Sequence, residues 1–189
     1  KSTYKSAPSR FLYVGRYDEL KGIKLLLIAV KRLLDDGFNL TLNLHGEGPF
    51  RASILKMVDD LSLESSVHVN GWVSKKELDQ TYLSHDCLVF PSLRDSGGLV
   101  VLESMQQGVP VISTCLGGPG TILNNSPDFC VENVFSVDDF VSDLYGKMKS
   151  FCEGRDKYRD SQMALSLAKK FYYKNHLHEI YCNIIKVLV

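Results

Sequence analysis

Strand-like and helix-like segments alternate along most of this 189-residue chain, and this alternation constrains the fold more than any single motif. Phe11-Leu12-Tyr13-Val14 is a short apolar run typical of a strand, and the stretch after it repeats its apolar residues at helical spacing. The same order recurs, with strands expected at 11–14, 40–44, 67–69, 87–90 and 109–112. Helices are expected at 21–36, 49–61, 74–82, 137–151, 155–171 and 177–188, and around Glu103. The chain should therefore form parallel βαβ units in a doubly wound α/β sheet.

Local signals mark the ends of several of these elements. Pro49 is expected at the first position of its helix, and Ser74 and Glu77 match a capping box at the start of the next. Residues 87–90 form a continuous apolar run, as expected for a strand in the middle of a parallel sheet. Pro110 fits a central strand poorly, because proline has no N–H to donate to the ladder.

The composition excludes several classes of protein. The 22 basic and 22 acidic residues cancel, and a net charge of zero argues against a nucleic-acid-binding protein and against a basic membrane-binding patch. The length favours a single domain, and no apolar run approaches the ~20 residues that a membrane-spanning helix needs. No secretory signal peptide stands at the start. Because the chain begins with Lys1 rather than Met, we expect that a segment upstream has been removed.

The cysteine pattern predicts reduced thiols. The five cysteines are odd in number, widely spaced and without a C-x-x-C pair, which fits neither a disulfide framework nor a structural zinc site and indicates a cytoplasmic protein. His176 and His178 are two positions apart and do not share a helix face, so we expect no metal there. The cysteines are Cys87, Cys115, Cys130, Cys152 and Cys182.

Glycine-rich or charged loops follow the expected strands. Because parallel strands end at the same edge of a sheet, where open α/β sheets bind ligands, these loops should converge on one site. The loops are Gly15-Arg16, Gly46-Glu47-Gly48-Pro49, Gly71-Trp72, Pro91-Ser92 with Gly97-Gly98, and Gly117-Gly118-Pro119-Gly120. The sequence has no G-x-G-x-x-G, G-K-[ST] or G-x-S-x-G motif, which argues against a dehydrogenase, a P-loop NTPase and a serine hydrolase.

The segment 90–120 has the features of an anion site between two acids. If a helix begins near Gly98, its first N–H groups lack an intrahelical partner, its N-terminus carries about half a positive charge, and glycine lets a phosphate come close. Asp95 and Glu103 stand eight positions apart, and carboxylates suit vicinal sugar hydroxyls because they accept two hydrogen bonds at once. The alternatives are a plain turn at Gly97-Gly98 and a solvated helix residue at Glu103.

The pair Asp95 and Glu103 resembles the acid-x7-acid motif of the retaining glycosyltransferases of family 4, also called glycosyl transferases group 1. From about Arg10 to Val189 the chain keeps that family's motifs in order: G-R with K-G, G-x-G-P, G-W, P-S, the two acids, G-V-P-V and G-G. The resemblance implies the C-terminal, donor-binding domain of a GT-B enzyme, which has two Rossmann-like domains with the active site between them.

The resemblance also implies roles for individual residues. Glu103 would hold the ribose hydroxyls, and Asp95 would contact the donor sugar. Arg16 and Lys21 would neutralise the diphosphate as the leaving group departs, although Lys21 could instead be a solvated residue of a helical turn. We therefore expect Asp95, Arg16 and Lys21 to be catalytic. The family most often has Glu at the first acid, so the shorter Asp95 implies a closer sugar, a bridging water or a different donor.

The other loops are expected to bind the donor. Gly46 and Gly48 would let the backbone approach the nucleotide, and Trp72 would either stack near the base or pack at the rim. Residues 117–120 would lie near the donor sugar, or are simply a turn. The complete set of expected donor-binding residues is Gly15, Gly46, Gly48, Gly71, Trp72, Ser96, Gly97, Gly98, Leu99 and Glu103.

On this resemblance, residues 1–9 are an interdomain linker, residues 10–189 are the donor-binding domain, and the N-terminal acceptor domain is absent. We expect a UDP- or GDP-sugar as substrate, no metal or other cofactor, retention of anomeric configuration, and a glycan or lipid-linked acceptor of polysaccharide or lipopolysaccharide assembly. The full-length enzyme should be cytoplasmic, with peripheral association at the inner face of the membrane. This chain alone should bind nucleotide but be inert.

Two other interpretations remain open. Another GT-B enzyme, such as a sugar-nucleotide epimerase or a phosphorylase, would share the fold, although a phosphorylase needs a pyridoxal lysine and a longer chain. A non-catalytic binding or interaction module would also share it, with Asp95 as a sign of lost activity. Nucleotide binding without added metal would separate the donor half of an enzyme from such a module.

Overall fold

A six-stranded parallel sheet forms the centre of the computed structural model, which describes residues 8–132 and 134–171. The strand order is β3-β2-β1-β4-β5-β6 and every neighbouring pair is parallel, which confirms the predicted doubly wound sheet. The strands are β1 (Ser9–Val14), β2 (Leu40–His45), β3 (Val67–Asn70), β4 (Cys87–Phe90), β5 (Val111–Thr114) and β6 (Cys130–Val131).

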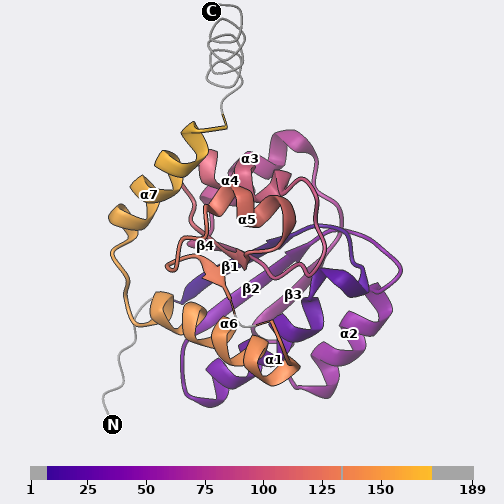
Figure 1. Cartoon of the computed structure of the whole chain (residues 1–189). Coiled ribbons are helices and arrows are strands. Elements are labelled where there is room, and N and C mark those ends of the chain that lie inside the picture. The colour runs from indigo at the N-terminus through magenta and orange to yellow at the C-terminus, as the bar shows by residue number, and fades with distance from the viewer. Residues whose placement is uncertain (1–7, 133, 172–189) are drawn as a thin grey trace, which may run out of the picture.

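Helices cover both faces of this sheet. Figure 1 shows α1, α2 and α6 on one side of the strands and α3, α4 and α5 on the other. The last described helix, α7, packs against α4. The helices are a 3-10 turn (Glu19–Lys21), α1 (Ile23–Asp35), α2 (Arg51–Asp60), α3 (Lys75–Leu83), α4 (Leu99–Gln106), α5 (Gly117–Leu123), α6 (Val137–Cys152) and α7 (Lys157–Lys169).

The apolar patterns of the strands match their burial. Along β2, Leu40, Leu42 and Leu44 are buried, and the residues between them are half-buried. β4 is buried at every position, as its continuous apolar run predicts for a strand with both faces covered. The capping box predicted at the start of α3 is also confirmed.

The strand order reverses between β1 and β4, and this reversal fixes where a ligand can bind. In open α/β sheets the ligand crevice lies outside the carboxyl ends of the strands at such a switch point. The segment after β1 carries Arg16 and Lys21, and the segment after β4 carries Asp95 and Gly98. The fold therefore brings the three predicted catalytic residues to one edge of the sheet.

Two prolines differ from their predicted places. β5 begins at Val111 rather than Val109, so Pro110 precedes the strand and its missing N–H costs no ladder bond. The Pro110 carbonyl still accepts a hydrogen bond from Leu88 N at 2.9 Å. Pro49 likewise precedes α2 instead of occupying its first position.

The prediction of a loop or turn at residues 117–120 is wrong, because these residues begin α5. Glycine is a weak helix former, so the local sequence gives no helical signal here. The conformation depends on contacts with the loop after β4, where Gly118 N donates to Asp95 O at 3.0 Å. β6 was not predicted either, since a strand of two residues leaves no periodic pattern.

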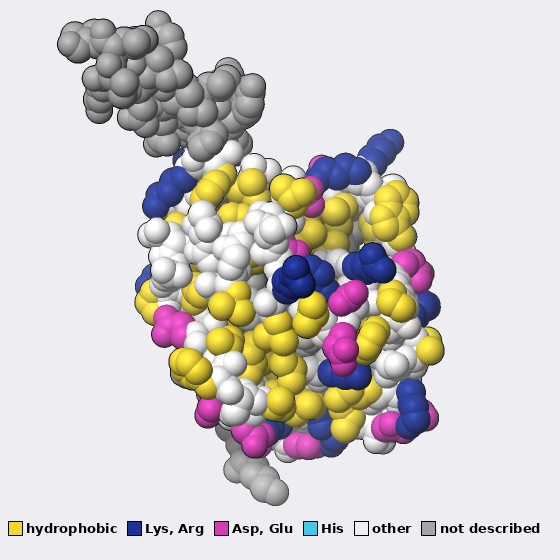
Figure 2. Space-filling view, turned by 45° about the vertical axis from the view of Figure 1, so that its right-hand side comes forward, with side chains coloured by type: hydrophobic (Ala, Val, Ile, Leu, Met, Phe, Trp, Pro, Cys, Tyr) yellow, Lys and Arg dark blue, Asp and Glu magenta, His cyan; other side chains and the backbone are white. Residues whose placement is uncertain are grey.

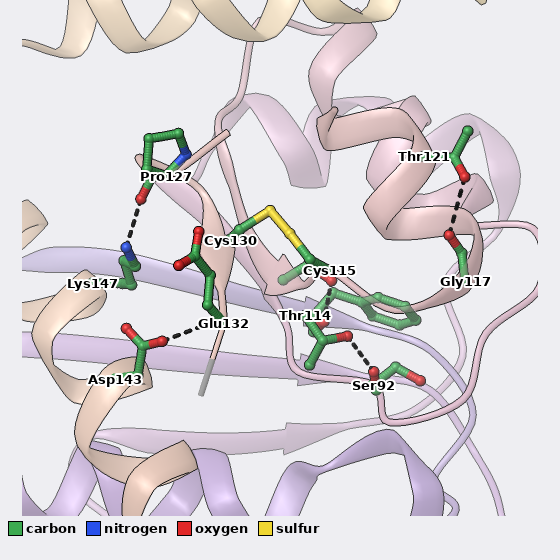
Figure 3. Close-up of a disulfide and its surroundings, with 12 residues drawn as sticks. Ser92, Thr114, Cys115, Gly117, Thr121, Pro127, Cys130, Glu132, Asp143 and Lys147 are labelled. Carbon is green, nitrogen blue, oxygen red and sulfur yellow. Dashed lines mark hydrogen bonds between the residues drawn. A yellow bond between two sulfur atoms is a disulfide. The ribbon is translucent and has the colours of Figure 1, made fainter. Parts of the chain in front are cut away.

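The prediction of reduced thiols is wrong for one pair of cysteines. Cys115 and Cys130 form a disulfide with Cα atoms 5.5 Å apart, as Figure 3 shows. In the register of the two strands Ser113 lies opposite Cys130, which brings Cys115, the residue just beyond β5, beside its partner. Of the other described cysteines, Cys87 and Cys152 are free thiols, as predicted.

Some predictions fall on the part of the chain that lies outside the described residues. They are the helix at 177–188, Cys182, the histidine pair at 176 and 178, and residues 1–7 of the expected linker. The division into a linker at 1–9 and a domain at 10–189 therefore stays a prediction. Within the described residues, no helix is long and apolar enough to cross a membrane.

Candidate functional site

Two adjoining cavities open at the carboxyl edge of the sheet. The β4-side cavity, of about 440 Å³, is lined by Gly15, Arg16, Lys21, Phe90, Asp95, Ser96, Gly97, Gly98, Leu99 and Val100. The β2-side cavity, of about 300 Å³, is lined by Val14, Gly15, Arg16, His45, Gly46, Glu47, Trp72, Val73 and Leu78. They share Gly15 and Arg16, so one elongated ligand could occupy both, and their sizes are typical of small-molecule sites.

The carboxylate of Asp95 is held on three sides in the β4-side cavity. Its Oδ2 lies 2.7 Å from Lys21 Nζ, and its Oδ1 accepts from Gly97 N at 3.1 Å and Gly98 N at 2.6 Å. Burial alone raises the pKa of Asp95, but the bonds from Lys21, Gly98 and Gly97 outweigh it and hold the pKa below its usual range. Asp95 is therefore ionised at neutral pH and cannot act as a proton donor there.

The length of the Asp95 side chain suits this arrangement. Aspartate commonly accepts hydrogen bonds from backbone N–H groups two or three residues further along, whereas glutamate is one methylene too long for that turn. A carboxylate offers about four lone-pair sites, and three described donors occupy three of them. Asp95 thus keeps capacity for one further donor, such as a ligand hydroxyl.

The N–H groups that can receive an anion are shifted from those predicted. Gly97 and Gly98 were expected to offer open N–H groups, but both donate to Asp95. α4 begins at Leu99, and the first N–H groups of a helix have no intrahelical partner. The N–H groups of Leu99 and Val100, two residues that line the cavity, are therefore the ones available to bind an anion. The cavity keeps the partial positive charge of a helix N-terminus.

Arg16 supplies the uncompensated positive charge of the site. Its side chain is exposed and lines both cavities, and within the described ranges no acidic side chain forms an ion pair with it. Its backbone carbonyl accepts a hydrogen bond from the Tyr13 hydroxyl at 3.0 Å, which fixes the start of the segment after β1. Lys21, by contrast, has its charge balanced by Asp95 and also donates to Arg94 O at 3.2 Å.

Glycines let the loops at this edge approach one another closely. Gly98 has φ 63°, and a Cβ on it would lie 2.9 Å from Pro119 N. A Cβ on Gly118 would lie 2.5 Å from Gly97 C, so the start of α5 packs directly on the backbone of the loop after β4. Residues 117–120 line neither cavity, so the predicted contact with a donor sugar is not part of the observed geometry.

The glycines after β2 and β3 have a similar packing role. A Cβ on Gly46 would lie 1.9 Å from Gly15 O, and a Cβ on Gly48 would lie 2.3 Å from Tyr17 O. Gly71 O accepts from Gly46 N at 3.1 Å. Gly46 lines the β2-side cavity, whereas Gly48 and Gly71, which were also expected to bind the donor, line neither cavity.

Trp72 lines the β2-side cavity and is 74% exposed, so it is not packed against the rim by any of the described residues. Apolar groups of Val14, Val73 and Leu78 line the same cavity, and none of these was predicted, because single apolar residues give no functional signal. His45 forms part of the wall, and burial together with the nearby His85 lowers its pKa, so it is neutral at pH 7.

Glu103 lines neither cavity but is held between α3 and α4. The Tyr82 hydroxyl donates to its Oε2 at 3.2 Å, and Lys75 forms an ion pair with its Oε1. Its side chain is 28% exposed, so the alternative of a freely solvated helix residue does not describe it. Glu103 lies one helical turn beyond Leu99, which does line the β4-side cavity.

Charge around these elements is mixed. On the face shown in Figure 2, basic and acidic side chains lie beside one another and form no broad patch of one sign. This mixture agrees with the net charge of zero.

Comparison with known protein families assigns the chain to one of them. The model for glycosyl transferases group 1 matches residues 1–160, which is most of the chain. The chain belongs to the glycosyl transferases group 1. Among relatives of this glycosyltransferase domain, a protein of the cps region of Klebsiella pneumoniae is 29% identical over 164 residues, covering 82% of this chain and 44% of the relative. A sulfoquinovosyl transferase of Arabidopsis thaliana is 28% identical over 145 residues, covering 77% of this chain and 27% of the relative.

Solved glycosyltransferases share the fold. The pneumococcal O-GlcNAc transferase GtfA, solved in complex with UDP and GlcNAc, superposes with a TM-score of 0.79 at 18% identity, covering 96% of this chain and 36% of that one. The domain therefore has the Rossmann-like fold of one half of a GT-B enzyme, as predicted. It spans less than half the length of these relatives.

Proposed function

We propose that this glycosyltransferase domain binds a nucleotide-diphosphate sugar across its two cavities and is the donor-binding half of a retaining enzyme. The observation that carries this proposal is the shared wall of the cavities at the β1–β4 switch point. There Arg16, which forms no ion pair with any described acidic residue, lines the same cavity as the start of α4. A nucleotide sugar is an elongated ligand with a diphosphate in its middle, which matches two cavities joined at a cation.

The base fits the β2-side cavity and the diphosphate fits the shared wall. The β2-side cavity has apolar walls and an exposed tryptophan, Trp72, on which a base can stack. Arg16 can bind phosphate oxygens with two parallel N–H groups, and Leu99 and Val100, whose N–H groups begin α4, line the same cavity as Arg16. Glu103, one turn further along α4, would then hold the ribose.

The donor sugar would lie in the β4-side cavity beside Asp95. When the bond to the sugar breaks, negative charge develops on the leaving diphosphate, and fixed cations stabilise it more in that state than before. Arg16 and Lys21 are the side chains positioned for this task. These groups supply the positive charge that a metal provides in other transferases, so we expect binding without added metal.

The whole protein would divide its work between two domains. We infer that residues 1–9 link this domain, residues 10–189, to an N-terminal domain that binds a glycan or lipid-linked acceptor. On this proposal the isolated chain binds nucleotide but does not transfer sugar, and the full protein makes peripheral contact with a membrane. Detectable glycosyl transfer by the purified chain alone would contradict the division of labour between the two domains.

A thermal-shift titration with UDP, GDP and ADP in the presence of EDTA tests the proposal. A ligand at 100 times its dissociation constant adds about 2.7 kcal/mol to the free energy of unfolding. We expect one nucleotide to raise the melting temperature of the wild type and not of Arg16→Ala. Lys56→Ala, which removes an exposed lysine paired with Asp60 of α2, is the matched control and should respond like the wild type.

The outcome separates the proposal from its rivals. A non-catalytic interaction module would show no shift with any nucleotide, either in this chain or in the full-length protein, and that result would refute the donor-site assignment. A sugar-nucleotide epimerase would bind nucleotide but would convert the donor without any acceptor, which product analysis of the full-length protein detects.

A further inference from the structure

The Glu103 carboxylate is held by two residues of α3 that have different characters. Tyr82 is fully buried and donates its hydroxyl hydrogen bond to Oε2 at 3.2 Å. Lys75 is 68% exposed on its side chain and pairs with Oε1. An exposed ion pair of this kind contributes little to stability, so the buried hydroxyl is the partner that fixes the carboxylate.

The Tyr82 hydroxyl is not required for packing. A phenylalanine would fill the same space, and a buried hydroxyl without a partner costs free energy. Burial and the nearby Glu103 charge raise the pKa of Tyr82, so its hydroxyl stays protonated and remains a donor. We therefore expect the function of this hydroxyl to depend on the Glu103 carboxylate that it contacts.

The helix that carries Tyr82 is firmly placed. Ser74 and Glu77 close its N-terminus with a capping box in which the Ser74 N–H donates to Glu77 Oε2 at 3.2 Å. Leu78, one helical turn before Tyr82, is buried and lines the β2-side cavity. α3 thus connects the wall of that cavity to the Glu103 carboxylate on α4 through rigid, buried contacts.

We propose that Tyr82 is a positioning residue for the donor ribose, because its hydroxyl fixes Glu103 Oε2 and so turns the free lone pairs of the carboxylate toward a vicinal diol. This inference rests on the proposed function, in which Glu103 holds the ribose of a nucleotide that spans both cavities. A carboxylate fixed at one oxygen accepts two neighbouring hydroxyls with less loss of rotational freedom than a mobile one. Tyr82 itself touches no ligand.

This positioning is measured by a ratio of dissociation constants, in which the value for a nucleotide analogue without the ribose diol is divided by the value for the nucleotide itself. The probe pair is the nucleoside diphosphate that the wild type binds, UDP, GDP or ADP, and its 2′,3′-dideoxy analogue, which lacks the diol. In the wild type we expect the analogue to bind at least about tenfold more weakly, since losing hydrogen bonds to a charged group is costly. Tyr82→Phe should bring that ratio about three- to tenfold closer to one while leaving the affinity for the analogue within about twofold.

Two controls keep the test specific. Tyr17→Phe removes another fully buried hydroxyl, which donates to Leu44 O at 2.9 Å and Asn70 O at 2.7 Å and has no contact with Glu103. It should leave the ratio unchanged even if it lowers stability. Glu103→Gln keeps the side-chain volume but removes the charge, and it should lower the ratio at least as far as Tyr82→Phe does.

The possible results are distinguishable. If the wild type binds a nucleotide with a high ratio and Tyr82→Phe weakens both probes equally, the tyrosine is only structural and the inference is overturned while the donor site stands. The inference is also overturned if Tyr82→Phe changes neither dissociation constant. If the wild type and the full-length protein bind no nucleotide, the proposed function and this inference fail together.

Discussion

Reducing the Cys115–Cys130 disulfide should lower the free energy of unfolding by a predictable amount. The bond closes a loop with a sequence separation of 15 residues. In the chain-entropy description, a loop of that length restricts the unfolded chain by about 3 kcal/mol, which the folded state gains as stability. For a chain of this size we expect the melting temperature to fall by roughly 6–12 °C on reduction.

Urea denaturation with and without a strong reductant measures this difference. The matched control is the double variant Cys115→Ala with Cys130→Ala, whose stability should not respond to reductant, although it retains Cys87 and Cys152. Titration of thiols in the denatured, unreduced protein gives an independent check. The chain has five cysteines and the disulfide uses two, which leaves three to react.

Two results would refute this reasoning. Five reactive thiols in the unreduced protein would mean that the bond does not form, and the prediction of reduced cysteines from the sequence would be restored. Three thiols with no change of stability on reduction would mean that loop closure is not what the bond contributes. We expect reduction to lower stability because the disulfide lies where β5 is joined to the loop after β4. Thr114, next to Cys115, also joins these two segments, and its hydroxyl donates to Ser92 O at 2.5 Å, as Figure 3 shows.

Two further predictions concern charged groups away from the site. Asp160 is 2% exposed on its side chain and accepts two hydrogen bonds from Arg155, so Asp160→Ala leaves a guanidinium that is only 16% exposed without that partner and should cost about 3–5 kcal/mol in chemical denaturation. A loss below about 1 kcal/mol would contradict it. Burial raises the pKa of Asp86, but hydrogen bonds from Arg10 and Lys157 outweigh it and hold the pKa below the usual 3.8. Its contribution to stability is therefore present above pH 3.8 and is lost as the pH falls through the lower folded value, so a plot of unfolding free energy against pH should be flatter there in Asp86→Asn than in the wild type.

The fold could be predicted from the sequence where the signal is local. The alternating leucines of β2, the buried run of β4 and the capping box of α3 are each encoded within a few neighbouring residues. Parallel topology then brings their following loops to one edge without further information. The elements that were missed, α5 and β6, are short and depend on packing against other parts of the chain.

The same distinction applies to the site. The family resemblance, together with the convergence of the loops that follow the strands, predicted that Arg16, Lys21 and Asp95 share one site, and the structure brings all three to the β4-side cavity. The ion pair between Lys21 and Asp95 could not be read from the sequence, because 74 positions separate the two residues. The contact of Tyr82 with Glu103 is likewise set by how α3 packs on α4. Their roles in binding and catalysis stay predictions.

Mapping amide chemical shifts while a nucleoside diphosphate is added, with EDTA present, tests the central claim most directly. If the switch point is the donor site, the backbone signals of Arg16, Leu99 and Val100 should move in proportion to ligand occupancy, because these residues line the cavity where the diphosphate would bind. Signals of Asp86 and Lys157, at the opposite edge of the sheet, should stay in place. Shifts centred on that opposite edge, or saturable binding that leaves the Leu99 and Val100 amides unmoved, would contradict the assignment.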